Sequence, residues 1–212
     1  MSSSSSCSES ASSSVVYDHE PFATFRLRVL ELAQSIWVGA SPEEITIERM
    51  AGGGFNRIIG LSRTIGSQEE EKTQYVLRVP RFDAAQLDRE VAVLQFVRRY
   101  SEIPVPEVVG FNETSNNVLG DPYMVQKRVP GFDLYSSFPK LDHTSKCRIA
   151  QQLGLFFRQM LSLRSQVAGV LVLPPDNKSL EAPLQVAPFC GTDPSSSAGL
   201  TLLRCTGNTK HA

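Results

Sequence analysis

The chain has 212 residues, which is enough for one or two domains and for one sizeable hydrophobic core. Its 21 Lys and Arg residues balance 22 Asp and Glu residues, so net charge gives no general attraction to nucleic acid or to an anionic membrane. A hydrophobic content of 41% is too high for a wholly disordered chain, and no apolar run approaches the ~20 residues of a membrane span.

The N-terminal segment is dominated by serine, which occupies ten of the first fourteen positions. Such a segment cannot bury enough apolar surface to fold, so residues 1–16 are predicted to be a disordered, solvated tail, with phosphorylation as the alternative. The acidic residues before Arg26, which are Glu9, Asp18 and Glu20, and the lack of an apolar run do not fit a secretory signal or a transit peptide. The four cysteines form no C-x-x-C pair, so we expect no disulfide framework and no zinc site, and a cytoplasmic setting.

The first predicted elements are a helix and three strands. The helix begins at Pro21 and ends near Gly39, because apolar residues recur at spacings of three and four. Strands are predicted over 45–50, 55–65 and 73–79 from their partly alternating, β-branched pattern. Two successive hairpins of this kind make a three-stranded antiparallel meander.

Two helices and two strands are predicted next. A helix over 84–100 carries an apolar stripe, and strands at 107–111 and 123–129 follow it; the stripe consists of Leu87, Val91, Leu94 and Val97. A last helix covers about 145–163, and Asp142 or Thr144 is expected to cap it in preference to a Cys/His site at His143 and Cys147. From Leu173 onward prolines and serines interrupt every pattern, so loop or disorder is predicted.

A glycine cluster lies in the turn between the first two strands and consists of Gly52, Gly53 and Gly54, followed by Phe55 and Asn56. A dinucleotide fingerprint needs a helix after the glycines, and a Walker loop needs a Gly-Lys pair, so both are excluded. Within a hairpin, glycines allow the backbone N–H groups to fold over nucleotide phosphates, because no Cβ holds the backbone away. A plain hairpin turn is the alternative for the cluster taken alone.

Glu90 lies inside the apolar stripe of the second helix, without a basic residue one turn away. An unpartnered carboxylate facing a core is costly, so Glu90 is predicted to pair with Arg78 on the third strand unless this part of the helix is exposed. A basic strand-three residue paired with a helix glutamate beneath a glycine turn is the phosphate-orienting arrangement of kinases. A purely structural ion pair, or two solvent-facing charges, is the alternative.

The ordered set of these segments resembles the aminoglycoside phosphotransferase and choline-kinase-like family, especially its fungal version. The segments that carry the resemblance are 51–57, 75–80, 88–91, 103–108 and 122–131, and the similarity runs from about Phe22 to Leu171. It implies an α+β, protein-kinase-like fold: an N-lobe with a five-stranded antiparallel sheet and a helix, followed by a partial helical C-lobe. The implied domains are a disordered tail (1–16), the N-lobe with its preceding helix (17–129), a hinge with a partial C-lobe (130–171) and an irregular tail (172–212).

The resemblance also implies a site for ATP between two lobes. The glycine turn, Arg78 and Glu90 would contact or orient the nucleotide, with Arg78 in place of the family's strand-three lysine. Arginine keeps the charge and can contact two oxygens, but it is bulkier than lysine. The hinge that faces adenine is expected at Gln126, Lys127 and Val129, through backbone atoms.

The family's catalytic loop, H-x-D-x-x-x-x-N, has no counterpart in the chain. No histidine is followed by Asp two residues later, and no aspartate is followed by Asn five residues later. The family's later magnesium-binding Asp also lacks a match, so no catalytic or metal-binding residue is assigned and Mg²⁺ would need ligands from elsewhere. The similarity is expected to stop near Leu171, just before the catalytic loop, and the tail resembles sequence never selected to fold.

The implied function is therefore ATP-dependent phosphoryl transfer to a small-molecule hydroxyl, catalytically incomplete in this chain. A non-catalytic nucleotide- or protein-binding fragment is the alternative. The expected partners are a nucleotide and a protein that covers the apolar face of the last helix; no nucleic acid or membrane partner is expected.

Overall fold

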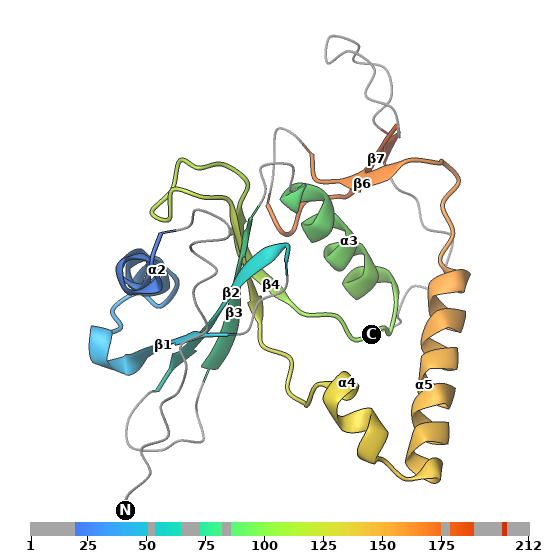
Figure 1. Cartoon of the computed structure of the whole chain (residues 1–212). Helices are drawn as coiled ribbons and strands as arrows, with labels where there is room; N and C mark the ends of the chain where they lie inside the picture. Colours follow the sequence, from blue (N-terminus) through green and yellow to red (C-terminus); the bar gives the residue numbers. More distant parts are fainter. Residues whose placement is uncertain are drawn as a thin grey trace, which may run out of the picture. The chain divides into compact units, whose positions relative to one another are not determined.

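The computed structural model describes residues 20–50, 54–64, 73–81, 86–174, 179–188 and 201–202. The predicted disordered tail, Gly52 and Gly53 lie outside these residues. Along the chain (Figure 1) the elements are α2 (Phe22–Ile36), η1 (Pro42–Glu44), β1 (Ile45–Arg49), β2 (Asn56–Arg63), β3 (Thr73–Pro80), α3 (Leu87–Tyr100), β4 (Val108–Asn112), β5 (Tyr123–Lys127), α4 (Leu134–Ser137), η3 (Phe138–Lys140), α5 (His143–Ser162), β6 (Val170–Val172), β7 (Gln185–Ala187) and β8 (Thr201–Leu202).

Strands β1 to β5 form a five-stranded antiparallel sheet in the order β1-β2-β3-β5-β4, which confirms the predicted α+β fold. The chain divides into two compact units, residues 1–83 with 114–122, and residues 84–113 with 123–212. The predicted lobe boundary near residue 129 stays a prediction.

In the first unit, α2 covers one face of the β1 to β3 meander (Figure 1). The side chain of Trp37, directly after α2, stacks on Tyr75 of β3 with ring centroids 5.2 Å apart. Alternate strand residues point to this face and are buried, as the two-residue period of a strand requires. The resulting core consists of Phe25, Val29, Leu32 and Ala33 from α2 with Ile45, Ile47, Ile59, Leu61, Leu77 and Val79 from the strands.

In the second unit, α3 is the centre of the hydrophobic core. The helix is confirmed from Leu87 onward, but its buried stripe is rotated from the predicted one, with Val91, Ala92 and Phe96 fully or almost fully buried. The core cluster comprises Leu87, Val91, Ala92, Phe96, Val108, Met124, Leu173 and Leu184, with Leu94 and Val97 at its edge. The rotation follows from contacts with β4, β5 and β6, which the helix sequence alone does not contain.

Residues after Leu173 also belong to this core, so the prediction of loop or disorder there is wrong for part of the segment. Strand β7 pairs with β6, with Val170 opposite Ala187, and β8 pairs with β7. Arg99 of α3 donates hydrogen bonds to the carbonyl oxygens of Leu180 and Ala182, the latter at 2.8 Å. Strands of only three residues carry too few positions for a period to show in the sequence.

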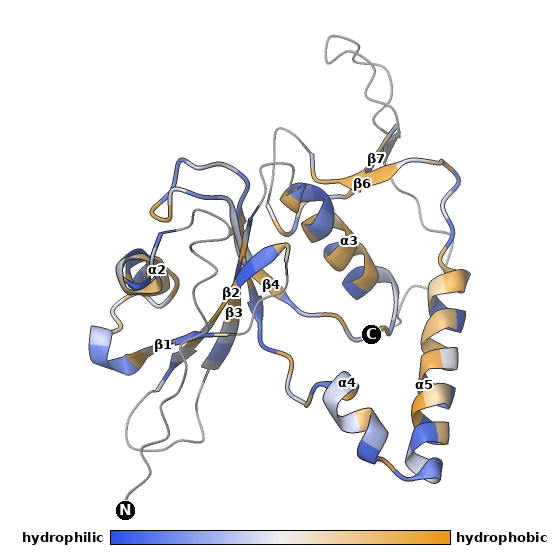
Figure 2. Cartoon of the chain, viewed as in Figure 1, coloured by the Kyte–Doolittle hydropathy of each residue, from blue (hydrophilic) through white to orange (hydrophobic). Residues whose placement is uncertain are grey.

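Helix α5 begins as predicted, because the Asp142 carboxylate accepts a hydrogen bond from the Ser145 N–H at 2.9 Å. None of its residues is buried, although hydrophobic residues recur along it (Figure 2). An apolar pocket of about 520 Å³ lies beside the helix and includes Glu102 and Pro104 in its lining. No helix within the described ranges combines the length and apolarity that a membrane span requires.

Candidate functional site

The described part of the glycine turn lies at one end of the β2–β3 hairpin. Gly54 and Phe55 are exposed, and Asn56 opens β2 opposite Pro80 of β3. The Arg81 N–H donates a 2.9 Å hydrogen bond to the Phe55 carbonyl, which extends the ladder by one step. Phe55, at the described end of the turn, is therefore tied to the residue that follows β3, three positions beyond Arg78.

Arg78 lies on the face of the meander that α2 does not cover. It is half-buried and stands opposite Ile58, while its neighbours Leu77 and Val79 fill the α2 face. Val76, opposite Gly60, shares the face of Arg78 and is also half-buried. The first unit thus places the Arg78 guanidinium on the same face as the apolar side chains of Ile58 and Val76, near the end of the hairpin where Gly54 and Phe55 lie.

Ile58 and Val76 were not among the predicted site residues. The signal that identifies them is the strand period, because residues two positions from Arg78 and directly opposite it must share its face. Such a surface suits a planar aromatic ring, while the guanidinium suits an anionic group.

Glu90 lies in the first turn of α3 and is half-buried, so it flanks the core and does not face into it. Its N–H donates to the Gln86 carbonyl at 3.1 Å. Arg78 belongs to the first compact unit and Glu90 to the second. Their ion pair stays a prediction.

The predicted hinge residues lie at the end of β5 and just after it. The Lys127 N–H already donates to the Glu107 carbonyl at 2.8 Å, so it is not available to a nucleotide. Gln126 buries a side-chain oxygen, Oε1, that accepts no hydrogen bond from the described residues. Val129 lies beyond the strand and is 61% exposed. Hinge contacts would therefore fall to the Lys127 carbonyl and to Val129.

A charge cluster that the sequence did not reveal includes one of the predicted hinge residues. The Glu107 carboxylate accepts from Lys127 Nζ at 2.8 Å and from the Arg98 guanidinium at 3.0 Å. The hydrogen bond from Lys127, helped by Arg98 and opposed by burial, holds the pKa of Glu107 below its usual value. The cluster joins the end of α3 to the end of β5, where the predicted hinge begins.

Metal ligands are the remaining part of the predicted chemistry. Within the described ranges, no three His, Cys, Asp or Glu side chains come together in a group that could hold a metal ion. We therefore assign none of the described residues as a ligand of Mg²⁺.

Comparison with known proteins identifies the family. The sequence model of the phosphotransferase enzyme family (APH) matches residues 62–186, more than half of the chain. The chain belongs to this family. The match includes Arg78, Glu90 and the residues of the predicted hinge, but it begins after the glycine turn. It also extends past Leu171 through β6 and into β7, so the prediction that the similarity ends near Leu171 is wrong.

Two curated relatives are subtelomeric hrmA-associated cluster proteins from two strains of Aspergillus fumigatus. Each is 30% identical over 129 residues, which cover 59% of this chain and 24% of the relative. The chain thus spans about a quarter of the length of the curated relatives it matches.

Proposed function

We propose that the chain is the nucleotide-binding part of an ATP-dependent phosphotransferase that acts on the hydroxyl group of a small molecule. The observation that carries the proposal is the position of Arg78, half-buried on the face of the β2–β3 hairpin that α2 does not cover, in a chain of the phosphotransferase family. Without a catalytic loop of the family type in its 212 residues, we expect the chain by itself to bind nucleotide without transferring phosphate.

The chemistry of this face of the hairpin supports a nucleotide. Ile58 and Val76 offer apolar surface to a purine, and the Arg78 guanidinium can donate two parallel hydrogen bonds to phosphate oxygens. Bound ATP would supply the transferable phosphoryl group. Gly54 leaves the adjacent turn free of a Cβ, which is what close approach of the backbone N–H groups to phosphates requires.

The predicted hinge lies in the second compact unit and has backbone groups of its own to offer a nucleotide. Lys127 ends β5, Val129 follows two residues later, and the Glu107 carboxylate forms ion pairs with Lys127 and Arg98. Backbone donors and acceptors at such a position would read the edge of adenine. The buried Oε1 atom of Gln126 is a further acceptor close by.

The alternative is a module that binds a nucleotide or a protein without any catalytic role. The absence of an H-x-D-x-x-x-x-N segment favours it for this chain. A nucleotide-binding module and a phosphotransferase both require nucleotide affinity, and substrate-dependent ADP release separates the two; a module that binds only a protein requires no nucleotide affinity. A protein surface over the exposed apolar residues of α5 and a cytoplasmic location remain parts of the proposal.

The test is equilibrium binding of a fluorescent ATP analogue to the full chain and to Arg78→Ala. Loss of a charge-assisted contact of about 1.5–3 kcal/mol would weaken binding about tenfold to a hundredfold. Arg26→Ala, which removes an exposed arginine from α2, is the matched control and should bind like the parent chain. Equal affinity of all three proteins would refute the proposed site, and substrate-dependent ADP release would refute the expected lack of turnover.

A further inference from the structure

Helix α5 carries an apolar stripe that the described part of the chain leaves largely uncovered. Ile149, Leu153, Phe156 and Met160 recur at spacings of three and four, so they share one side of the helix (Figure 2). None of the residues of α5 is buried, and Leu153, in the middle of the stripe, is 47% exposed. The rings of Phe156 and Phe157 meet edge to face with centroids 5.7 Å apart and widen the apolar surface. Exposed apolar surface of this kind marks an interaction site.

The apolar pocket beside α5 is a groove that follows the helix for about three turns. Its lining on α5 extends from Arg148 to Gln159, a rise of about 16 Å along the helix axis. The opposite wall includes Pro104, in the loop that follows α3, and the groove holds about 520 Å³. The lining is mostly apolar, and its apolar residues are Pro104, Ile149, Leu153, Leu155 and Phe156.

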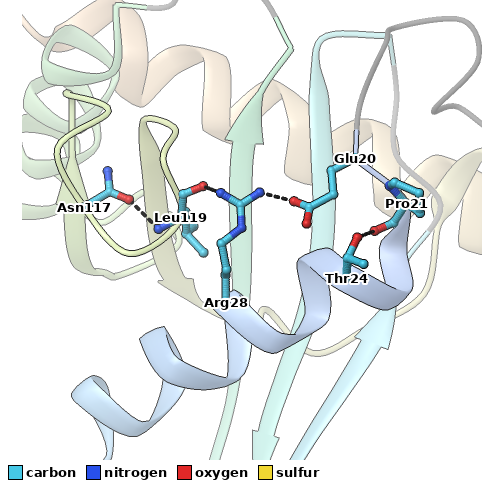
Figure 3. A network of polar contacts seen from close by, with 6 residues as sticks. All are labelled: Glu20, Pro21, Thr24, Arg28, Asn117 and Leu119. Carbon is cyan, nitrogen blue, oxygen red and sulfur yellow. Dashed lines mark hydrogen bonds and ion pairs between the residues drawn. The ribbon is translucent and has the colours of Figure 1, made fainter.

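A positive charge without a partner among the described residues lies in this lining. Arg148 makes no hydrogen bond or ion pair with another described residue, in contrast to Arg28 of α2, which donates to the Glu20 carboxylate and to the Leu119 carbonyl (Figure 3). The twenty residues of α5 include no Asp or Glu. Glu102 is the acidic residue of the lining, and it belongs to the loop. Along α5, the groove therefore offers apolar surface and one guanidinium that suits an acidic group.

We propose that this groove is the docking site for an amphipathic helix of another protein, with its apolar side chains toward α5 and an acidic residue next to Arg148. Amphipathic helices bind in apolar grooves through anchors three, four and seven residues apart, and three turns of α5 provide room for such a set. The contact with Arg148 fixes the direction of the partner helix. The inference rests on the part of the proposed function that gives α5 a protein partner, and it does not depend on nucleotide binding.

Two other occupants fit the groove less well. A second copy of the chain would bring together two α5 helices with three basic and no acidic residues each, so that like charges would meet. An anionic membrane surface would contact a helix from one side, whereas Pro104 and α5 form two walls of a recess. A separate helix with acidic residues meets both conditions.

The test is fluorescence anisotropy of a labelled, designed peptide titrated with the full chain. The peptide is an alanine-based helix of about five turns, with leucines at spacings of three and four and glutamates along one edge of the leucine stripe. A second peptide keeps the leucines and carries lysine in place of each glutamate. The glutamate peptide should bind the chain about tenfold more tightly than the lysine peptide, because only the glutamate peptide complements the charge of α5.

Matched variants of α5 locate the binding site. Arg148→Gln should weaken binding of the glutamate peptide about threefold to tenfold, whereas Arg158→Gln removes the same charge outside the groove lining and should bind like the parent. Leu153→Ala should weaken binding of both peptides. Leu161→Ala should not, because position 161 lies two and a half turns from Gln152 and thus on the opposite side of α5. The four replaced side chains are exposed, so each variant should fold like the parent, which circular dichroism checks.

The outcomes either support the docking site or overturn it. Equal binding of the two peptides, or equal effects of Arg148→Gln and Arg158→Gln, would overturn it. So would binding to phosphatidylcholine vesicles that contain phosphatidylserine, or self-association in sedimentation, if Leu153→Ala abolishes that binding and neither peptide binds; these results would assign the surface to a membrane or to a second copy.

The fluorescent ATP analogue, titrated with the same proteins, separates this inference from the nucleotide function. Leu153→Ala should bind the analogue like the parent. Nucleotide binding without peptide binding refutes the docking site alone. Peptide binding without nucleotide binding refutes the nucleotide function and supports the docking site.

Discussion

Replacing Leu184 by alanine tests whether the segment after α5 is part of the folded core. Leu184 is only 4% exposed and lies in the same cluster as Leu87 and Val91 of α3. Without the structure, this position falls in a region where the sequence shows no regular pattern. A destabilising effect is therefore expected from the structure and not from the sequence.

The magnitude follows from burial. Leu→Ala at a fully buried site removes three carbon atoms and leaves a cavity, which together cost about 2–5 kcal/mol. Leu163, Leu171 and Leu180 are only partly buried neighbours and can move toward the space. We therefore expect a value in the lower half of that range, about 2–3 kcal/mol.

The assay is urea denaturation followed by far-UV circular dichroism, because α3 and α5 both lie in the unit that contains Leu184. Trp37 fluorescence reports on the other unit in the same samples. Leu161→Ala is the matched control: Leu161 is 67% exposed, so the same substitution should cost less than about 0.5 kcal/mol. Identical midpoints for the two variants would refute the reasoning.

Three further predictions concern the same unit. Gly169→Ala should destabilise this unit, because a Cβ at position 169 would collide with the Ala187 backbone. Gly154→Ala, where the space beside α5 is open, should stabilise the helix by about 0.5–1 kcal/mol. Thermal unfolding of the two variants tests both expectations. The pKa of Glu107 is lower in the folded state than in the unfolded state, so the stabilising effect of its carboxylate is present above about pH 4 and is lost as the pH falls through the folded value. Glu107→Gln should therefore destabilise the protein at pH 7, by less than about 1 kcal/mol for so exposed an ion pair. In acid the same substitution should not lower stability. The uncovered apolar residues of α5 should bind a hydrophobic dye, and a chain that leaves the dye unbound would contradict the exposure.

The elements with long, regular patterns could be predicted from the sequence. The meander follows from alternation in β1 to β3, and α5 follows from its period and its Asp142 cap. The place of Arg78 opposite the α2 face follows from the same alternation, because Leu77 and Val79 are the apolar residues on either side. In each case the pattern extends over enough residues for its period to be recognised.

Features that depend on contacts between distant segments could not be predicted. The Lys127 N–H is engaged by Glu107, twenty residues earlier, which removes one of the expected hinge donors. Arg99 is tied to carbonyl groups more than eighty residues later, in a segment that appeared irregular.

Nucleotide binding and phosphoryl transfer make different demands on this family, and the chain meets them unequally. Binding needs an apolar surface for the base and donors for the phosphates, and in the proposed site Ile58, Val76 and Arg78 would offer these from one face of a short hairpin. Transfer needs a positioned base and a metal clamp, which together supply most of the transition-state stabilisation. These groups belong to the H-x-D-x-x-x-x-N segment, which the 212 residues do not contain. A variant that lowers nucleotide affinity therefore tests the proposed site on this face of the hairpin, whereas a failure to turn over ATP would say nothing against that site.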